Sequence, residues 1–322
     1  MRAIRVHAFG GPEVLKFEEV PDPAPGPGEA VVRVEAAGVN FIDVYHRTGA
    51  YKAPLPSTLG QEGAGTVEAV APDVEFVAPG DRVAWASVSG AYAEKAAVPA
   101  ARLVRIPVGL TARQAAAAML QGMTAHYLAC STYPLKSRDA CLVQAAAGGV
   151  GLLLVQIAKL RGATVIGTVS SAEKARLARG AGADATVDYT KEDFEAAARR
   201  LTDGRGVHVV YDSVGRSTFQ KSLASLAPRG MLVLFGQSSG AVDPLDPQVL
   251  AQRGSLYLTR PTLAHYVASR EELLARAVEV LGWVRDGTLK LRIEHEFPLA
   301  EAAEAHRALE GRQTTGKILL IP

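Results

Sequence analysis

The stretch CLVQAAAGGVG, residues 141–151, decides the fold of this chain. It begins with apolar strand residues, turns through glycines and continues directly into an apolar segment that predicts a helix over 150–160. Glycines in such a strand–turn–helix let backbone amides approach a pyrophosphate, whose charge is met by the positive end of the helix. The stretch therefore predicts a dinucleotide site at Ala147, Gly148, Gly149 and Val150, although Ala146 stands where the usual pattern has its first glycine. The alternative is a turn with a structural role only.

From this turn onward, apolar strands alternate with amphipathic helices. Strands are predicted at residues 140–144, 164–169, 185–189, 207–212, 231–235 and 256–259, with helices at 150–160, 172–179, 193–201 and 218–226. Each crossover between parallel strands needs a helix on one face of the sheet or the other. The pattern therefore predicts an α/β fold with a six-stranded, doubly wound parallel sheet.

The rest of the chain has a different pattern. Short predicted strands at residues 2–7, 30–36, 65–70 and 82–85 are separated by Pro- and Gly-rich turns, as in a compact β-rich domain. Thr111 and Gln114 then form a capping-box pattern that predicts a helix leading out of this domain. After the sheet, a helix over 270–285, a strand near 289–297 and a closing strand over 317–321 are predicted to return to the first domain.

Composition excludes several classes of protein. The 322 residues are 48% hydrophobic and 21% charged, which is typical of a globular protein. The formal charge is +2 and no basic block stands out, so we do not expect a nucleic-acid partner. Cys130 and Cys141 are too few for a disulfide framework, which favours a cytoplasmic location. Residues 1–11 lack the core of a signal peptide, and Gln144 and Gly148 interrupt the one stretch that resembles a membrane span.

The end of the second strand of the parallel sheet indicates which dinucleotide binds. An NAD site places an acidic residue about 20 positions after the glycine turn, where it binds the ribose 2′-hydroxyl. This chain has Thr168 there, followed by Ser170 and then Lys174. Small hydroxyl side chains leave room for a phosphate and Lys174 offers a charge, so NADPH is favoured over NADH. The alternative is that Lys174 is a solvated helix residue.

Seven segments, in order along the chain, resemble the zinc-free quinone oxidoreductases, the ζ-crystallin-like branch of the medium-chain dehydrogenase/reductase superfamily. They are GGPEVL (10–15), GVNFID (38–43), GQEGAG (60–65), GDRV (80–83), AAAGGVG (145–151), YDSVG (211–215) and FGQSSG (235–240). The resemblance implies a GroES-like catalytic domain of residues 1–120 and 262–322. It also implies an NADPH-binding Rossmann domain of residues 121–261, with the cofactor in the cleft between the domains.

The sequence departs from the zinc-dependent relatives at the metal ligands. Those relatives have a cysteine where this chain has Asn40 and a histidine where it has Gln61, and a third ligand near residues 120–124 is also missing. A catalytic zinc needs three protein ligands and one open position. We therefore expect no metal site and no alcohol dehydrogenase mechanism.

Without a Lewis acid, the acceptor must take hydride unaided, and a quinone suits this because its product is a stabilised hydroquinone anion. Enals and enones are the next choice. By resemblance, the cleft is lined by Asn40, Asp43, Tyr45, Tyr51 and Gln61. Asn40 and Gln61 can donate hydrogen bonds to a carbonyl oxygen, and the tyrosines can stack or donate, or simply pack. Asp43 could instead be only a buried partner of a backbone amide.

Further cofactor contacts carry over by resemblance, each with a structural role as the alternative. They are Gln121, Thr124, Tyr189, Phe235, Ser238 and Arg312. The leading hypothesis is an NADPH-dependent, zinc-independent quinone oxidoreductase. The alternatives are an NADPH-dependent enal or enone double-bond reductase, and a low-turnover NADPH-binding structural or RNA-binding protein. The apolar strand over residues 255–259 ends the predicted sheet, so we expect a homodimer through that edge.

Overall fold

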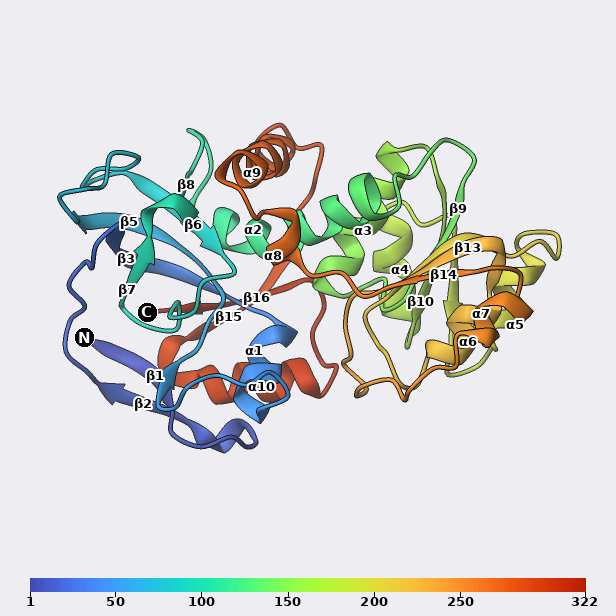
Figure 1. Ribbon diagram of the computed structural model, residues 1–322, viewed down its shortest axis with the longest axis horizontal. Helices are drawn as coiled ribbons and strands as arrows, with labels where there is room; N and C mark the ends of the chain where they lie inside the picture. Colours follow the sequence, from blue (N-terminus) through green and yellow to red (C-terminus); the bar gives the residue numbers. More distant parts are fainter. The chain divides into compact units, whose positions relative to one another are not determined.

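The computed structural model describes residues 1–322 as two compact units (Figure 1). The first unit consists of Met1–Met123 and Tyr266–Pro322, and the second of Thr124–His265. The two ends of the chain share one sheet, because the closing strand β16 (Lys317–Ile321) pairs antiparallel with β3 (Glu29–Val39). The closing strand therefore belongs to a sheet of the first unit.

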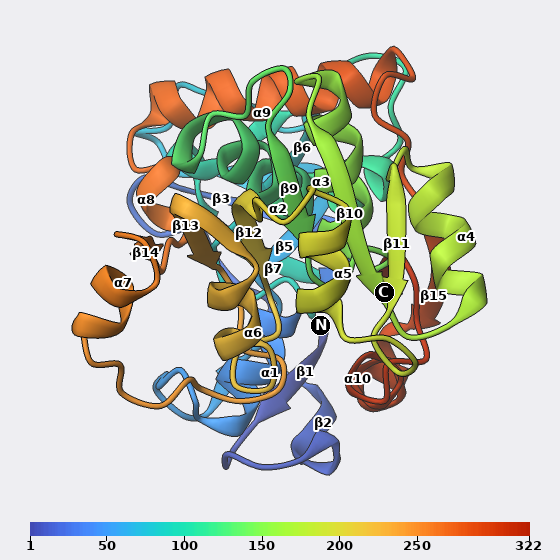
Figure 2. The ribbon, with the colours of Figure 1, turned by 90° about the vertical axis from the view of Figure 1, so that its right-hand side faces the viewer.

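The second unit is built on six parallel strands in the order β11-β10-β9-β12-β13-β14, most of which are visible side by side in Figure 2. The strands are β9 (Ala140–Val143), β10 (Thr164–Val169), β11 (Ala185–Asp188), β12 (Val207–Asp212), β13 (Leu226–Leu234) and β14 (Tyr257–Thr259). This order is that of a dinucleotide-binding fold, which confirms the predicted fold class. Strand β13 begins five residues before its predicted start, because its irregular first part still pairs with Val207 of β12.

Helices cover both faces of this sheet. They are α3 (Gly149–Leu160), α4 (Ala172–Gly180), α5 (Phe194–Arg200), α6 (Phe219–Ala224) and α7 (Gln248–Gln252). Phe194 of α5 and Phe219 of α6 pack in one apolar core with Leu142 and Val210 of the sheet. Helices α3 and α4 contact each other and strand β10. The short α7, between β13 and β14, was not predicted from the sequence.

The first unit is rich in antiparallel sheet. Its three-stranded sheet has the order β2-β1-β4, and its seven-stranded sheet has the order β15-β16-β3-β5-β6-β8, with β7 paired to β3. The remaining strands are β1 (Arg2–Val6), β2 (Leu15–Glu19), β4 (Ser57–Thr58), β5 (Glu62–Val70), β6 (Arg82–Ala86), β7 (Lys95–Pro99), β8 (Val104–Arg105) and β15 (Ile293–Pro298). The core between these strands contains Trp85 and Tyr92, both fully buried.

The other helices are α1 (Phe41–Thr48), α2 (Ala112–Tyr127), α8 (Leu263–Tyr266), α9 (Arg270–Arg285) and α10 (Ala302–Glu310). Single helical turns occur at η1 (Pro12–Val14), η2 (Ala100–Arg102), η3 (Leu128–Thr132) and η4 (Leu299–Glu301). The predicted start of α2 is confirmed, because the Gln114 amide donates to Thr111 Oγ1 and Gln114 Oε1 accepts from the Thr111 amide. None of the helices is long and apolar enough to cross a membrane.

Buried polar groups connect α1 to α10. Arg47 of α1 is 1% exposed and donates to both carboxylate oxygens of Glu310, at 2.8 Å each. It also donates to Nδ1 of His306, at 3.1 Å. Because arginine cannot accept a hydrogen bond, His306 carries its proton on Nε2, which lies 3.3 Å from the Tyr92 hydroxyl. Tyr92 in turn donates to Asp43 at 3.0 Å, so each donor in this series of hydrogen bonds is matched to an acceptor.

His306 is neutral in the folded protein. Burial, and then the charge of Arg47, lower the pKa of His306 from 6.5 to about 3. A buried imidazole with a cation as its neighbour has no counter-charge to stabilise a second proton. The imidazole therefore stays a one-proton link between Arg47 and Tyr92.

We predict that a His306→Gln variant is less sensitive to acid than the wild type. The unfolded chain takes up a proton at His306 near pH 6.5 and the folded chain only near pH 3. As the pH falls between these two values, protonation of His306 in the unfolded chain therefore lowers the unfolding free energy of the wild type by about 1.4 kcal/mol per pH unit. Glutamine does not titrate, so the stability of the variant, lower at neutral pH, should approach that of the wild type on acidification. Calorimetric Tm values from about pH 7.5 to about pH 5 would measure this.

Burial raises the pKa of Asp43 to about 7, which contributes pH dependence of the opposite sign. Asp43 is present in both proteins, so comparing the two Tm profiles isolates the contribution of His306. A constant difference in Tm across the whole pH range would contradict the prediction.

Candidate active site

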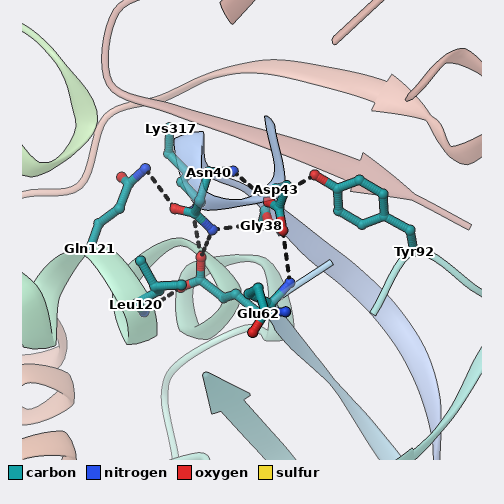
Figure 3. Close-up of polar contacts among 9 residues, drawn as sticks. Gly38, Asn40, Asp43, Glu62, Tyr92, Leu120, Gln121 and Lys317 are labelled. Carbon is teal, nitrogen blue, oxygen red and sulfur yellow. Dashed lines mark hydrogen bonds and ion pairs between the residues drawn. The ribbon is translucent and has the colours of Figure 1, made fainter. Parts of the chain in front are cut away.

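Asn40 stands between strand β3 and helix α1, and its side-chain amide makes four hydrogen bonds (Figure 3). Oδ1 accepts from Lys317 Nζ at 2.9 Å and from Gln121 Nε2 at 3.1 Å. Nδ2 donates to Glu62 Oε2 at 2.9 Å and to the Gly38 carbonyl at 3.1 Å. Asn40 is 4% exposed, so its side-chain amide forms its hydrogen bonds with protein groups and not with solvent.

Glu62 and Lys317 form an ion pair in the interior of the first unit. Their side chains are 0% and 3% exposed. The second carboxylate oxygen of Glu62 accepts a hydrogen bond from the backbone amide of Leu120, which lies within helix α2. Buried charges are stable only when they are paired and hydrogen-bonded, and here both requirements are met.

Gly38 makes the space for this ion pair. A Cβ atom at Gly38 would lie 2.2 Å from Glu62 Oε2 and 2.7 Å from Lys317 Nζ. These are distances that real Cβ atoms do not reach, so a glycine at this position is required by the two side chains packed against it.

Asp43 joins the two loops that carry Asn40 and Gln61. It is fully buried and accepts from the Asn40 amide at 2.8 Å, from the Gln61 amide at 3.1 Å and from the Tyr92 hydroxyl at 3.0 Å. Burial raises the pKa of Asp43 to about 7, although these donors and Lys317 act in the opposite direction. The carboxyl group is thus a partner of backbone amides, which is the second of the two roles considered from the sequence.

The remaining residues predicted for the substrate side are less buried. Gln61 Nε2 donates to the Ser89 hydroxyl. The rings of Tyr45 and Tyr51 lie 5.2 Å apart with an interplanar angle of 59°, and Phe41 and His46 make further ring contacts with this pair. No group of three or more His, Cys, Asp or Glu side chains is arranged to hold a metal ion.

In the second unit, the glycine turn follows strand β9. Ala145 has a positive φ of 53°, and Gly148 is the N-cap of α3, so no side chain caps the first amides of that helix. A Cβ at Gly151 would lie 2.3 Å from the Ala145 carbonyl oxygen. The methyl group of Ala146 takes the space that Gly167 of β10 leaves open, since a Cβ at Gly167 would lie 2.6 Å from it. Gly167 thus compensates for the missing first glycine of the pattern.

Other predicted cofactor residues follow the carboxyl ends of the parallel strands. Ser170 follows β10, Tyr189 follows β11, and Phe235 and Ser238 follow β13. Carboxyl ends of parallel strands meet at one edge of the sheet, which is where ligands bind in such folds. Lys174 lies half-buried in the first turn of α4, whose N-cap is Ser171.

Thr168 has a different position from these residues. It is fully buried, donates to Gln144 Oε1 at 2.6 Å and accepts from the Ala145 amide at 3.2 Å. Thr168 therefore holds the start of the glycine turn through hydrogen bonds to Gln144 and Ala145, within the second unit. Thr124 is 8% exposed in the second unit, and Arg312 is exposed in the first, with a φ of 56°.

The sequence analysis selected Asn40, Asp43, Gln61 and Gln121, which the structure joins by hydrogen bonds, but it missed four of the side chains that bond to them. Lys317, Ser89 and Tyr92 lie outside the seven segments that carry the resemblance, and Glu62 lies within GQEGAG (60–65) but was given no role. One signal was present, because Lys317 precedes the fully apolar run Ile318-Leu319-Leu320 and Glu62 follows Gln61 at the start of a buried strand.

Comparison with known proteins is consistent with this architecture. Residues 26–108 match the model of the alcohol dehydrogenase GroES-like domain, and residues 149–279 match that of the zinc-binding dehydrogenase. A quinone oxidoreductase of Pseudomonas aeruginosa is 49% identical, over all of this chain and 99% of that protein. A 2-haloacrylate reductase of a Burkholderia species is 44% identical, over 98% of both chains.

The crystal structure of an Escherichia coli quinone oxidoreductase complexed with NADPH matches this fold with a TM-score of 0.98. The two proteins are 43% identical, and the match covers all of both chains. Asn40 and Gln61 occupy the positions at which the resemblance identified lost zinc ligands, and the GroES-like and nucleotide-binding parts are both present. The chain therefore belongs to the zinc-free quinone oxidoreductase branch of the medium-chain dehydrogenase/reductase superfamily.

Proposed function

We propose that this chain transfers hydride from NADPH to a quinone. Membership of the branch makes the chain an oxidoreductase. The observation that carries the finer proposal is a pair of neutral amides, those of Asn40 and Gln61, at the positions where the zinc-dependent relatives have metal ligands. Asn40 and Gln61 replace the thiolate and imidazole ligands of a catalytic zinc, and the ring pair of Tyr45 and Tyr51 lies in the same unit.

The residues of the second unit fit the cofactor. Gly148 leaves the first amides of α3 available to a pyrophosphate, and the close approach of Gly151 to Ala145 leaves no room for a side chain. Ser170 and Lys174 would receive the 2′-phosphate. NADPH supplies the hydride when bound, and the protein positions it against a flat ring and excludes water.

The residues of the first unit would orient the acceptor. Gln61 Nε2 has one N–H beyond the bond to Ser89, and the tyrosine pair offers a flat surface. A reduced quinone is a stabilised anion that can take its proton from water. No side chain is therefore required as the proton donor in this proposal.

The second candidate is reduction of an activated double bond, and the relative named 2-haloacrylate reductase favours it. A haloacrylate is an anion and would need a cation in the site. The two buried cations of the first unit are already paired, Lys317 with Glu62 and Arg47 with Glu310. This pairing favours a neutral acceptor, so we place quinones before acrylates.

A substrate panel tests the function. We expect NADPH-dependent turnover with phenanthrenequinone and simple benzoquinones, and kcat/KM at least about ten-fold lower with 2-alkenals and 2-haloacrylates, which corresponds to about 1.4 kcal/mol of transition-state stabilisation. Activity should persist in strong chelators. Higher kcat/KM with the alkenals or haloacrylates would replace the quinone by the second candidate, and binding of NADPH without turnover would favour the low-turnover alternative.

We predict that Lys174→Ala weakens the binding of NADPH about ten-fold or more and leaves the binding of NADH almost unchanged. A charge-assisted hydrogen bond to phosphate contributes roughly 1.5 to 3 kcal/mol, and only NADPH carries the 2′-phosphate. Dissociation constants from cofactor fluorescence would measure both. Lys159→Ala is the matched control, because Lys159 bonds to Asp184 and the Ala163 carbonyl at the amino end of β10. Equal weakening of both cofactors by Lys174→Ala would contradict the assignment.

We predict a two-fold dimer through strand β14. This strand pairs only with β13 and forms the edge of the parallel sheet, where Tyr257 is 59% exposed and Leu258 is 36% exposed. An open edge with apolar side chains is a template for pairing with another chain. Light scattering should give twice the chain mass, and Leu258→Lys should shift the equilibrium toward the monomer. A monomer mass for the wild type at micromolar concentration would refute this interface.

A further inference from the structure

We propose that Lys317 is a positioning residue of the active site. Its ammonium group, together with Glu62, holds the side-chain amide of Asn40 in one orientation, and through Asn40 it holds the side chain of Gln121. The inference deepens the proposed function, because the positioned amides are those of the site assigned to hydride transfer.

The bonding capacity of Asn40 is fully used. A primary amide offers two N–H donors and two acceptor lone pairs. Both acceptor positions of Oδ1 are taken, by Lys317 and Gln121, and both donors of Nδ2 are taken, by Glu62 and the Gly38 carbonyl. A rotation of the amide by 180° would face donors with donors and acceptors with acceptors at all four contacts.

The ammonium group of Lys317 determines which way the amide points. Lys317 has no acceptor, so it can face only the oxygen of Asn40, and Glu62 as a carboxylate can face only the nitrogen. Two neutral apolar side chains in these positions would pack without setting any orientation. A buried ion pair is weak in net stabilisation compared with apolar packing, and specifying a unique arrangement is a role that such pairs can have.

Three features of the surrounding structure are built to hold this ion pair. Gly38 has no side chain, which leaves room for both charged groups. The Leu120 amide, inside helix α2, bonds to the second oxygen of Glu62. Lys317 is the first residue of a strand whose next three residues are buried and apolar, so its stem lies within the core. The site is therefore assembled from four segments, β3, β5, α2 and β16.

Asn40 has a different role from the one that the sequence suggested. The sequence suggested that Asn40 donates to the carbonyl oxygen of the acceptor, but no N–H of its side chain remains for this purpose. Gln121 uses one Nε2 hydrogen on Asn40, which leaves its second N–H and its Oε1 as the hydrogen-bonding groups that the positioned side chain offers. Asn40 thus acts through Gln121 and not on the ligand directly.

Nuclear magnetic resonance gives a direct test, because Asn40 is the only asparagine of the chain. A sample labelled with ¹⁵N-asparagine should show one side-chain NH₂ group. In the wild type we expect two separate proton signals with slow exchange against solvent, since both hydrogens are bonded and buried. In Glu62→Gln/Lys317→Met, which removes both charges, we expect faster exchange and movement of both signals. Unchanged signals in that variant would overturn the proposal, whatever the substrate of the protein is.

Kinetics separates positioning from simple charge compensation. Lys317→Met leaves Glu62 unpaired and should lower both Tm, by roughly 10 °C, and kcat/KM, by about ten-fold. The double variant Glu62→Gln/Lys317→Met should recover most of the Tm but not the kcat/KM. Recovery of both would show that Lys317 only neutralises Glu62. Lys95→Met is the matched control, because Lys95 also forms ion pairs in the first unit, with Asp22 and Glu68, and should leave kcat/KM unchanged.

A mutant cycle covers the case in which the double variant does not fold. If Lys317 acts through Asn40, Lys317→Met should change kcat/KM by less than about two-fold in an Asn40→Ala background, because coupled residues are not additive. A full ten-fold loss in that background would mean that Lys317 acts independently of Asn40. If the wild type reduces no acceptor, the proposed function fails, while the NH₂ exchange still decides the positioning role.

Discussion

The ion pair between Glu62 and Lys317 is the constraint on which the first unit depends. Charges of opposite sign in a dry interior are acceptable only if every donor and acceptor around them is matched. Glu62 meets this requirement with the Leu120 amide and Asn40, and Lys317 meets it with Glu62 and Asn40. The same contacts join segments that lie far apart in the sequence, so the packing of the unit and the geometry of its candidate site are one arrangement.

A second set of buried polar groups begins at the same point. Asn40 donates its backbone amide to Asp43, which also accepts from Tyr92, and the neutral His306 links Tyr92 to Arg47. The side chain of Asn40 therefore belongs to the ion-pair cluster and its backbone to this one. Because the two clusters share a residue, a change in either is expected to affect the junction between β3 and α1.

In the second unit, the candidate binding site is formed by the backbone of the glycine turn and not by paired side chains. A pyrophosphate is met by backbone amides, so the important residues of the turn are those that lack side chains, such as Gly148 and Gly151. Ala146 and Gly167 show that the first glycine of this pattern can be replaced by alanine when the facing residue is a glycine. A methyl group added on the turn is accommodated where the neighbouring strand has none. A motif search that demands the first glycine would miss this compensation.

The sequence by itself determined the six-stranded parallel sheet and the glycine turn at 145–151, because these depend on local period and short spacing. Helix α1 was not predicted, because its residues lie between two strands of a β-rich segment, where strands do not alternate with helices. The tertiary structure alone decided what Asn40 does. Its partner Lys317 lies 277 residues away, and nothing local in a sequence states which distant group a buried charge will meet. That choice arises only when β3, β5, α2 and β16 pack together and each buried polar atom must find a partner.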